Sequence, residues 1–198
     1  MERPFIVVYL VGVCIAGFIR FTQSRKHLRP NTPQIPSSDL WLMFLWFLAS
    51  QVLPMLYGFN PILTFANYPV PSFISILGIG VFGVALWLLR QSHLDLDDNW
   101  SPIAEIRSDQ HLMTQGIYHY MRHPMYSAHL LWGIAQGLLI SNWLVGWSGL
   151  LTFALFCCFR IPQEETMMRS HFGPAYIDYQ QTVGAIAPQL STLRSKTG

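Results

Sequence analysis

The chain has 198 residues, of which 52% are hydrophobic and 11% are charged, and its formal net charge is +2. Soluble globular domains carry about 25% charged residues, so this composition excludes an ordinary soluble domain and favours a polytopic membrane protein. The near-neutral charge excludes the basic surface that nucleic-acid binding requires, and the length fits one domain.

Five apolar runs follow one another along the chain. A transmembrane helix needs about 20 residues, so we expect an all-α membrane domain over residues 1–198 with about five transmembrane helices, of which the first and fourth are short. Pro54 is expected to kink the second helix. Only Ser141-Asn142 separates the last two runs, which predicts a helical hairpin over about 125–159. The runs cover residues 4–19, 40–57, 71–89, 125–140 and 143–159.

The basic residues predict one orientation. The run at 4–19 is followed by a basic flank and by no A-x-A-like cleavage site, so we interpret it as a retained first span. With five spans, every Lys and Arg except Arg3 falls on one side, eleven of the twelve. The positive-inside rule places that side in the cytoplasm and the N-terminus outside, in an inner or endoplasmic reticulum-type membrane.

A first polar segment, residues 111–126, leads into the fourth apolar run. Ionisable groups cost about 2.5–3.5 kcal/mol at mid-bilayer, so near lipid they usually serve function. Gly116 permits a tight turn. Arg122 and His123 precede Pro124, which suits a first helical turn, so this helix N-terminus should form an electropositive corner able to hold a carboxylate. Ordinary flanking residues of a membrane span are the alternative interpretation.

A second polar segment begins at Arg160. Arg160 and Glu164 are four residues apart and would share a helix face, although Pro162 lies between them and is a candidate start for a new helix after the fifth span. Glu164 and the adjacent Glu165 would be repelled by anionic lipid at a membrane boundary. A cationic ligand would explain them, and a surface ion pair of little energetic value is the alternative.

Other candidate sites are weaker. Asp95, Asp97 and Asp98 could hold a hard metal ion, but a solvated acidic loop is the favoured interpretation. His119 and His123 are four residues apart, yet the following proline disfavours a shared helix face. The cysteines show no CxxC spacing, so we expect no metal site. The GxSxG, P-loop and GxGxxG motifs are absent from the sequence, which argues against serine hydrolase, NTPase and Rossmann dinucleotide chemistry.

Together the two polar segments resemble the isoprenylcysteine carboxyl methyltransferase family, which is related to the phospholipid methyltransferases. The resemblance covers roughly residues 90–188, with Met113 where valine is common and Gln163 before the glutamate pair. The first ninety residues resemble the family only in hydropathy. The motifs that carry the resemblance are, in order, His111-Leu112-Met113-Thr114, Gly116-Ile117-Tyr118, Arg122-His123-Pro124-Met125-Tyr126, Arg160, Glu164-Glu165 and Phe172-Gly173-Pro174-Ala175-Tyr176-Ile177-Asp178-Tyr179.

The resemblance implies methyl transfer from S-adenosyl-L-methionine in a cytoplasmic pocket that the C-terminal segment closes. It implies a methyltransferase core at 91–198 and acceptor-shaping spans at 1–90. Arg160 and Arg122 would have catalytic roles, Arg160 by orienting an acceptor carboxylate. The implied cofactor-binding residues are Gln110, His111, Leu112, Met113, Gly116, Tyr118, His123, Pro124, Met125, Tyr126, Glu164 and Glu165.

The expected acceptor is lipid-like, most simply the carboxylate of an isoprenylcysteine-type molecule drawn from the membrane. A phospholipid amine or a small thiol is an alternative acceptor. An NADPH-dependent reductase of the sterol reductase type is an alternative enzyme, although Met125 and Tyr176 depart from its pattern. A non-enzymatic membrane scaffold or quinone-pathway accessory is a third hypothesis. No obligate protein partner is indicated.

Overall fold

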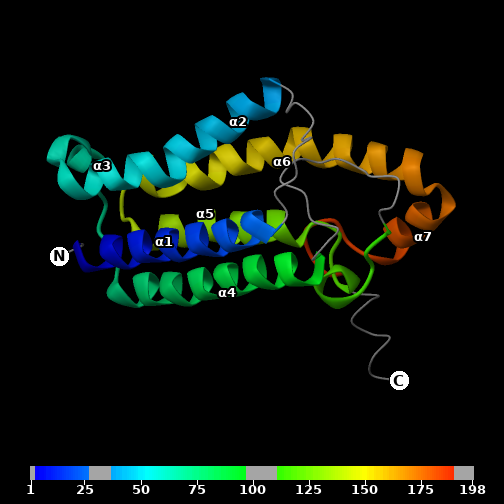
Figure 1. Cartoon of the computed structure of the whole chain (residues 1–198). Helices are drawn as coiled ribbons and strands as arrows, with labels where there is room; N and C mark the ends of the chain where they lie inside the picture. The colour runs from blue at the N-terminus through cyan, green and yellow to red at the C-terminus, as the bar shows by residue number, and fades with distance from the viewer. Residues whose placement is uncertain (1–2, 27–36, 97–110, 190–198) are drawn as a thin grey trace.

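The structure, a computed structural model, describes residues 3–26, 37–96 and 111–189. Over these residues it consists of helices and turns with two isolated bridges and no strand, which confirms the all-α prediction. The α-helices (Figure 1) are α1 (Arg3–Lys26), α2 (Ser37–Phe47), α3 (Leu53–Phe59), α4 (Ser72–Leu96), α5 (Pro124–Leu139), α6 (Trp143–Phe172) and α7 (Pro174–Thr182).

Four helical stretches in the described part of the chain are long and apolar enough to cross a membrane. They are Pro4–Gln23, Asp39–Phe59, Ser72–Leu96 and Trp143–Phe172. The fourth predicted span corresponds to α5, which has 16 residues and is therefore about 24 Å long, shorter than the bilayer core of about 30 Å. The fourth run is thus short, as expected, whereas the first extends into a full-length helix.

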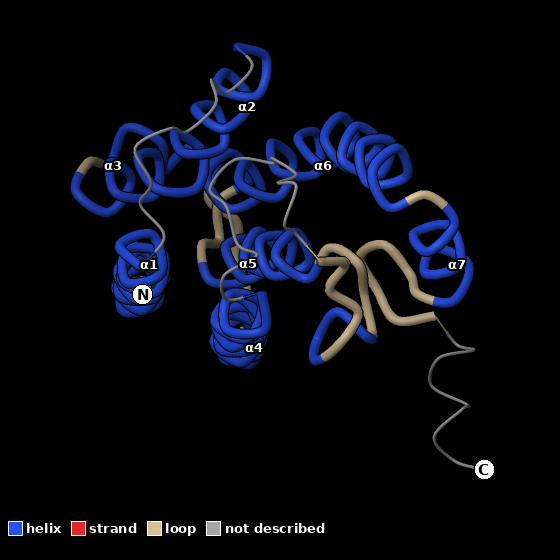
Figure 2. The backbone as a smooth tube through the Cα atoms, turned by 45° about the vertical axis from the view of Figure 1, so that its right-hand side comes forward, coloured by secondary structure: helices blue, strands red, loops and turns tan. Residues whose placement is uncertain are grey.

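Helix α5 lies at the centre of the bundle (Figure 2) and packs against α4 and α6, while α1 packs against α4 and α2 against α6. Phe82, Trp132 and Leu139 are among the buried side chains of the main hydrophobic core. Gly133 brings α5 close to α6, because a Cβ at this position would lie 2.6 Å from the Cα atom of Leu150. This close contact between α5 and α6 confirms the predicted helical hairpin.

The predicted kink at Pro54 takes the form of a change in helix type. A π-helical turn, Leu48–Val52, separates α2 from α3, and the Leu53 N–H donates to the Leu48 carbonyl. Because Pro54 has no N–H to donate, carbonyls in this turn are available to other helices. The Ala49 carbonyl accepts from Gln136 Nε2 at 2.9 Å, and the Tyr9 hydroxyl lies 2.5 Å from the Ser50 carbonyl.

Gln136 connects three parts of the bundle through its buried amide. Its Nε2 also donates to the Val145 carbonyl at 2.6 Å, and its Oε1 lies 2.9 Å from the Tyr9 hydroxyl. The Trp132 indole donates to the same hydroxyl at 2.9 Å. Because a polar group in lipid needs an internal partner, this network ties α1, the π-helical turn and α6 to α5.

Helix α6 continues farther than the apolar run predicted. The sequence left open whether Pro162 begins a new helix. In the structure it does not, because Pro162 lies inside one helix of 30 residues. Such a helix is about 45 Å long, so its last turns extend beyond the short α5. At its start, Asn142 caps the helix by accepting from the Leu144 and Val145 amides at 3.0 and 2.9 Å.

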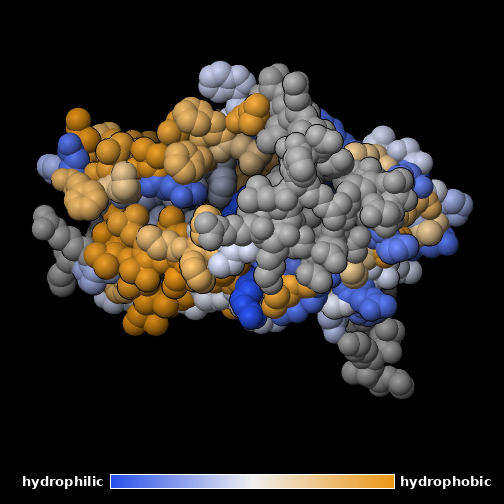
Figure 3. Space-filling model, viewed as in Figure 1, coloured by the Kyte–Doolittle hydropathy of each residue, from blue (hydrophilic) through white to orange (hydrophobic). Residues whose placement is uncertain are grey.

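One end of the molecule gathers the polar structure. The C-terminal ends of α1, α4 and α6 and the N-terminal ends of α2 and α5 lie there together with α7 (Figure 1). In Figure 3, most of the hydrophobic surface lies toward the opposite end, and hydrophilic side chains cover the part around α7. The two polar segments found in the sequence therefore meet at one end of the bundle.

Candidate functional site

The C-terminal segment is attached to the chain that leads into α5. The Arg122 amide donates to the Gly184 carbonyl at 2.9 Å, and the His123 amide donates to the Ala185 carbonyl at 2.8 Å. The Ser127 hydroxyl donates to the Ile186 carbonyl at 2.6 Å. These bonds hold residues 184–186 across the N-terminus of α5, so the C-terminal segment covers the polar end as the resemblance implied.

Glu165 is the buried centre of one charged group. Its Oε1 accepts from Arg122 Nε at 3.0 Å and Nη2 at 2.5 Å, and lies 3.3 Å from His123 Nε2. Its Oε2 accepts from Gln180 Nε2 at 2.8 Å. Arg122 also donates to the carbonyls of Val183 and Gln180. This group therefore fastens α6 and α7 to the N-terminus of α5.

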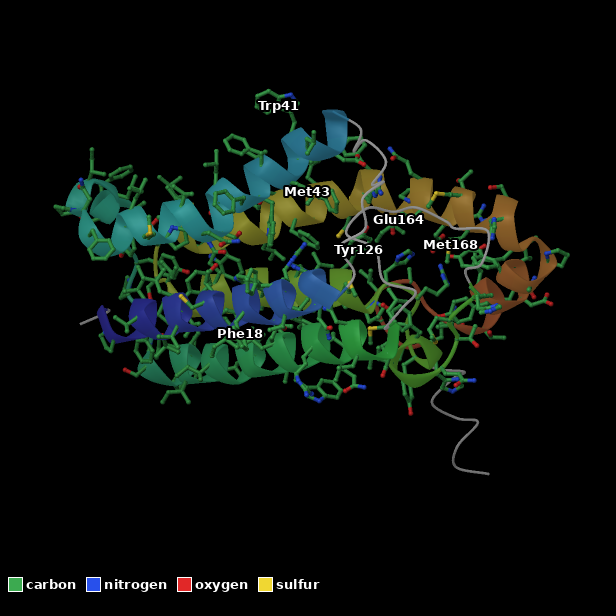
Figure 4. The ribbon with its side chains drawn as sticks, in the orientation of Figure 1. Phe18, Trp41, Met43, Tyr126, Glu164 and Met168 are labelled. Carbon is green, nitrogen blue, oxygen red and sulfur yellow. The ribbon has the colours of Figure 1, made fainter. Side chains whose placement is uncertain are left out.

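Glu164 is the centre of a second group on the neighbouring face of α6. Its Oε1 accepts from the Tyr126 hydroxyl at 2.5 Å and from Arg160 Nε at 3.0 Å. Its Oε2 lies 3.6 Å from His123 Nδ1. Figure 4 shows Tyr126 and Glu164 close together between α5 and α6. The Glu164 side chain retains 18% exposure, against 11% for Glu165, so Glu164 is the more accessible carboxylate of the pair.

Arg160 extends this second group to α2. Its Nη1 donates to the Asp39 carboxylate, while its Nε is engaged by Glu164. The Asp39 side chain is 6% exposed and that of Arg160 is 12% exposed. The guanidinium is therefore held between two carboxylates from different helices at the membrane boundary.

A tight turn precedes this site. Gly116 has a φ of +59°, and the following Ile117 amide donates to Asp95 Oδ2 at 2.6 Å. Asp95 also accepts from Gln91 at 2.6 Å. The solvated-loop interpretation of Asp95 is therefore wrong, because its carboxylate fixes the turn; Asp97 and Asp98 lie outside the described residues. No group of three potential metal ligands occurs in the described part of the chain.

Replacing Gly116 with alanine should weaken binding of S-adenosylhomocysteine, the product form of the donor that the resemblance implies, by about tenfold. The new Cβ would lie 2.2 Å from Asp95 Oδ2, and a left-handed conformation costs a non-glycine residue roughly 1–2 kcal/mol. Isothermal titration of detergent-solubilised protein measures the effect. Gly80→Ala is the matched control, because nothing lies within 4 Å of a Cβ at that position. Equal affinity in both variants would contradict a role for this turn.

Tyrosines connect the turn to α7. The Tyr179 hydroxyl donates to the Tyr118 carbonyl, and the Tyr118 hydroxyl lies 3.4 Å from the Ser92 carbonyl. Burial raises the pKa of Tyr176 to about 12 and raises the pKa values of Tyr118 and Tyr179 as well. All three therefore remain protonated at neutral pH, and the bond from Tyr179 persists there.

The remaining predicted site residues are distributed around this core. Leu112 packs with Met168 against the buried cluster of Tyr176, Tyr179 and Val183, whereas His111 is exposed and Met113 is half-buried. Pro124 is buried in the first turn of α5, and the Met125 carbonyl accepts from His129 Nδ1 at 2.6 Å. Gln110 lies outside the described residues.

Two participants were absent from the sequence prediction. Asp39 could have been noticed as an acidic residue at the start of an apolar run. His129, which showed no partner pattern, lies 3.3 Å from Arg20 Nη1. Because the Met125 carbonyl can only accept, His129 Nδ1 carries the proton and its Nε2 accepts from Arg20. This contact joins the end of α1 to α5, one helical turn from Tyr126.

The charges at this end favour a cationic ligand. Two buried carboxylates, from Asp39 and Glu165, and the partly buried carboxylate of Glu164 face the guanidinium groups of Arg122 and Arg160. The half-exposed Arg169 approaches Glu165 Oε2 at 3.6 Å. The site thus offers a carboxylate that retains some exposure, beside an arginine, with no obvious nucleophile.

Comparisons with known proteins find related sequences. Residues 76–170 match the model of the isoprenylcysteine carboxyl methyltransferase family. The chain is 28% identical over 117 residues to protein-S-isoprenylcysteine O-methyltransferase B of Arabidopsis thaliana, covering 58% of this chain and 59% of the relative. It is 26% identical to the Dictyostelium discoideum protein-S-isoprenylcysteine O-methyltransferase, covering 91% and 76%.

A solved structure gives the same result. The eukaryotic intramembrane Ras methyltransferase ICMT matches with a TM-score of 0.54 and 28% identity, over 78% of this chain and 52% of that one. The chain therefore spans little more than half the length of this structure and of the Arabidopsis relative. The family match includes α5 and α6 up to Ser170, and hence both glutamates. Residues 76–170 of this chain are therefore similar to the isoprenylcysteine carboxyl methyltransferase family.

Proposed function

We propose that the protein is an S-adenosyl-L-methionine-dependent membrane methyltransferase that esterifies the carboxylate of an isoprenylcysteine-type acceptor. The observation that carries the proposal is the arrangement of Glu164, which lies beside Tyr126 and His123 and is bonded to Arg160. One carboxylate and one guanidinium thus share a site at the membrane boundary. The names of the similar proteins support the same chemistry.

The residues of the site suit the proposed donor. S-adenosyl-L-methionine supplies a methyl group on a positively charged sulfur and also carries an ammonium and a carboxylate. Glu164 would hold a positive charge. His123 and the N-terminus of α5 would hold the carboxylate, since helix N-termini favour anions. Leu112 and Tyr118 would contact the uncharged part, and Tyr126 would keep Glu164 in place.

Arg160 would orient the acceptor. A carboxylate is already ionised at neutral pH, so attack on the methyl carbon requires no general base. The site must align the oxygen with the carbon–sulfur bond and exclude water. A guanidinium suits this task, because its rigid donors match carboxylate geometry. The carboxylate oxygen gains the methyl group, and the electron pair of the broken bond stays on sulfur.

The membrane placement completes the proposal. The acceptor would reach Arg160 from the bilayer, while the donor would enter from the aqueous side near α7. Because eleven of the twelve basic residues lie in segments of one predicted side, we place this end of the bundle in the cytoplasm. The spans before residue 90 would shape access for the acceptor.

Incubation of the protein in lipid nanodiscs with methyl-labelled donor and an S-farnesylcysteine derivative tests the proposal. Base treatment should release labelled methanol, because a methyl ester hydrolyses under conditions in which N-methyl and S-methyl groups persist. If the label resists base and is found in phosphatidylethanolamine or on a thiol, the acceptor is an amine or a thiol and not a carboxylate. Stabilisation by NADPH and not by S-adenosylhomocysteine would instead favour the reductase hypothesis.

A further inference from the structure

Asp39 lies in the first turn of α2, outside the residues that match the family model. An acidic residue in a first turn usually interacts with the helix dipole and is exposed. Asp39 differs, since its side chain is only 6% exposed and its carboxylate pairs with Arg160. The residues separated by 121 positions are thus joined directly. Interaction with the dipole of α2 alone would not require Asp39 to be buried against α6.

The contacts of Arg160 show what Asp39 adds. A guanidinium has five N–H donors in a fixed plane. Glu164 engages Nε at 3.0 Å and Asp39 engages Nη1, so the plane of the group is fixed from two sides. Nη2 is the nitrogen that neither carboxylate engages. Tyr126 also shares a hydrogen bond with Arg160, and Nη2 remains the part of the guanidinium that neither Asp39 nor Glu164 occupies.

Loss of Asp39 would change this arrangement. A carboxylate and a guanidinium prefer a bidentate pair with two parallel hydrogen bonds. With Asp39 absent, Glu164 can take Nε and Nη2 together, and Arg160 and Glu164 would then satisfy each other. Asp39 opposes that pairing by holding Nη1 from α2. It thereby keeps Nη2 of Arg160 available for the carboxylate of the acceptor.

We propose that Asp39 is a positioning residue for the acceptor: it holds Arg160 so that Nη2 faces the acceptor carboxylate, and the first turn of α2 belongs to the acceptor site. This inference rests on the proposed carboxyl methyl transfer. It adds a participant from the N-terminal spans, because α2 packs against α6 (Figure 1) and Asp39 contacts Arg160. Asp39 acts through Arg160 and need not touch the donor.

The test compares Asp39→Asn with the wild type in the nanodisc methyl-ester assay. Asparagine keeps the shape of the side chain and removes its charge. We expect kcat/KM for the S-farnesylcysteine acceptor to fall by about 10- to 100-fold, because small misplacement of an orienting group has effects of this size. The Kd for S-adenosylhomocysteine should change by less than about threefold. Asp178→Asn, at an exposed position on α7, is the matched control.

A double-mutant cycle separates positioning from stability. In an Arg160→Gln background, Asp39→Asn should lower kcat/KM for the acceptor no further. In the protein that keeps Arg160, Asp39→Glu should retain more of the wild-type rate than Asp39→Asn does. If Asp39→Asn costs the same factor in both backgrounds, or if activity falls only with the fraction of folded protein, the inference is overturned. If the wild type forms no methyl ester while binding S-adenosylhomocysteine, the proposed acceptor fails, whatever Asp39 does.

Discussion

Replacement of Arg160 by alanine is expected to lower methyl-ester formation by about 100-fold or more while donor affinity changes by less than about threefold. The expectation follows from the position of Arg160 between Asp39 and Glu164, where its guanidinium is the group suited to orient an acceptor carboxylate. Loss of orientation alone has effects of about this size. Steady-state kinetics with both substrates varied, together with titration of S-adenosylhomocysteine, measure the two quantities.

Two further variants make the Arg160 result specific. Arg160→Lys retains the charge but not the fixed planar fork, so it should recover only part of the lost rate. Arg90→Ala removes an exposed basic side chain from α4 and should leave the kinetics unchanged. An Arg160→Ala enzyme with normal acceptor kinetics would refute the carboxylate acceptor and would favour an amine or a thiol.

Replacement of Arg122 by leucine should cause the largest loss of stability, about 3–5 kcal/mol, which is the usual cost of removing one partner of a buried ion pair. The change would leave Glu165, whose side chain is 11% exposed, without its arginine. It would also remove the bonds from Arg122 to the Val183 and Gln180 carbonyls. Reversible unfolding in mixed detergent measures the free energy of unfolding.

Hydrogen exchange provides an independent measurement of the Arg122 effect. Detachment of residues 184–186 would expose the backbone amides of residue 122 and His123, which donate to Gly184 and Ala185. These amides should exchange faster in Arg122→Leu, while those of α4 remain protected. Arg169→Ala is the control, because its half-exposed side chain approaches Glu165 at only 3.6 Å and an exposed ion pair contributes about 1 kcal/mol or less. Equal losses in both variants would contradict the assigned role of Arg122.

The sequence predicted the elements better than their contacts. Apolar runs show directly which residues must form helices in lipid, and the two-residue gap at Ser141-Asn142 was sufficient to predict the hairpin. The uninterrupted course of α6 through Pro162 was not predictable. A proline favours a helix break locally, whereas packing of the long helix against its neighbours determines the outcome.

The candidate site was predictable as a set of residues but not as a geometry. The motifs indicated both glutamates, yet their different partners, Arg160 and Tyr126 for one and Arg122 for the other, depend on which face of α6 each occupies. The contact with Asp39 had no signal in one sequence, because nothing local relates residues 121 positions apart. Only the packing of α2 on α6 brings them together.

The π-helical turn at Leu48–Val52 has a consequence for how this protein family can vary in length. An α-helix turns by about 100° per residue, so a deletion elsewhere in the stretch from α2 to α3 would rotate everything beyond it by that angle. A π-helical turn accommodates one additional residue. Loss of one residue within Leu48–Val52 can therefore restore ordinary helical spacing while both flanks keep their faces, which makes this turn a place where a single-residue deletion is tolerated.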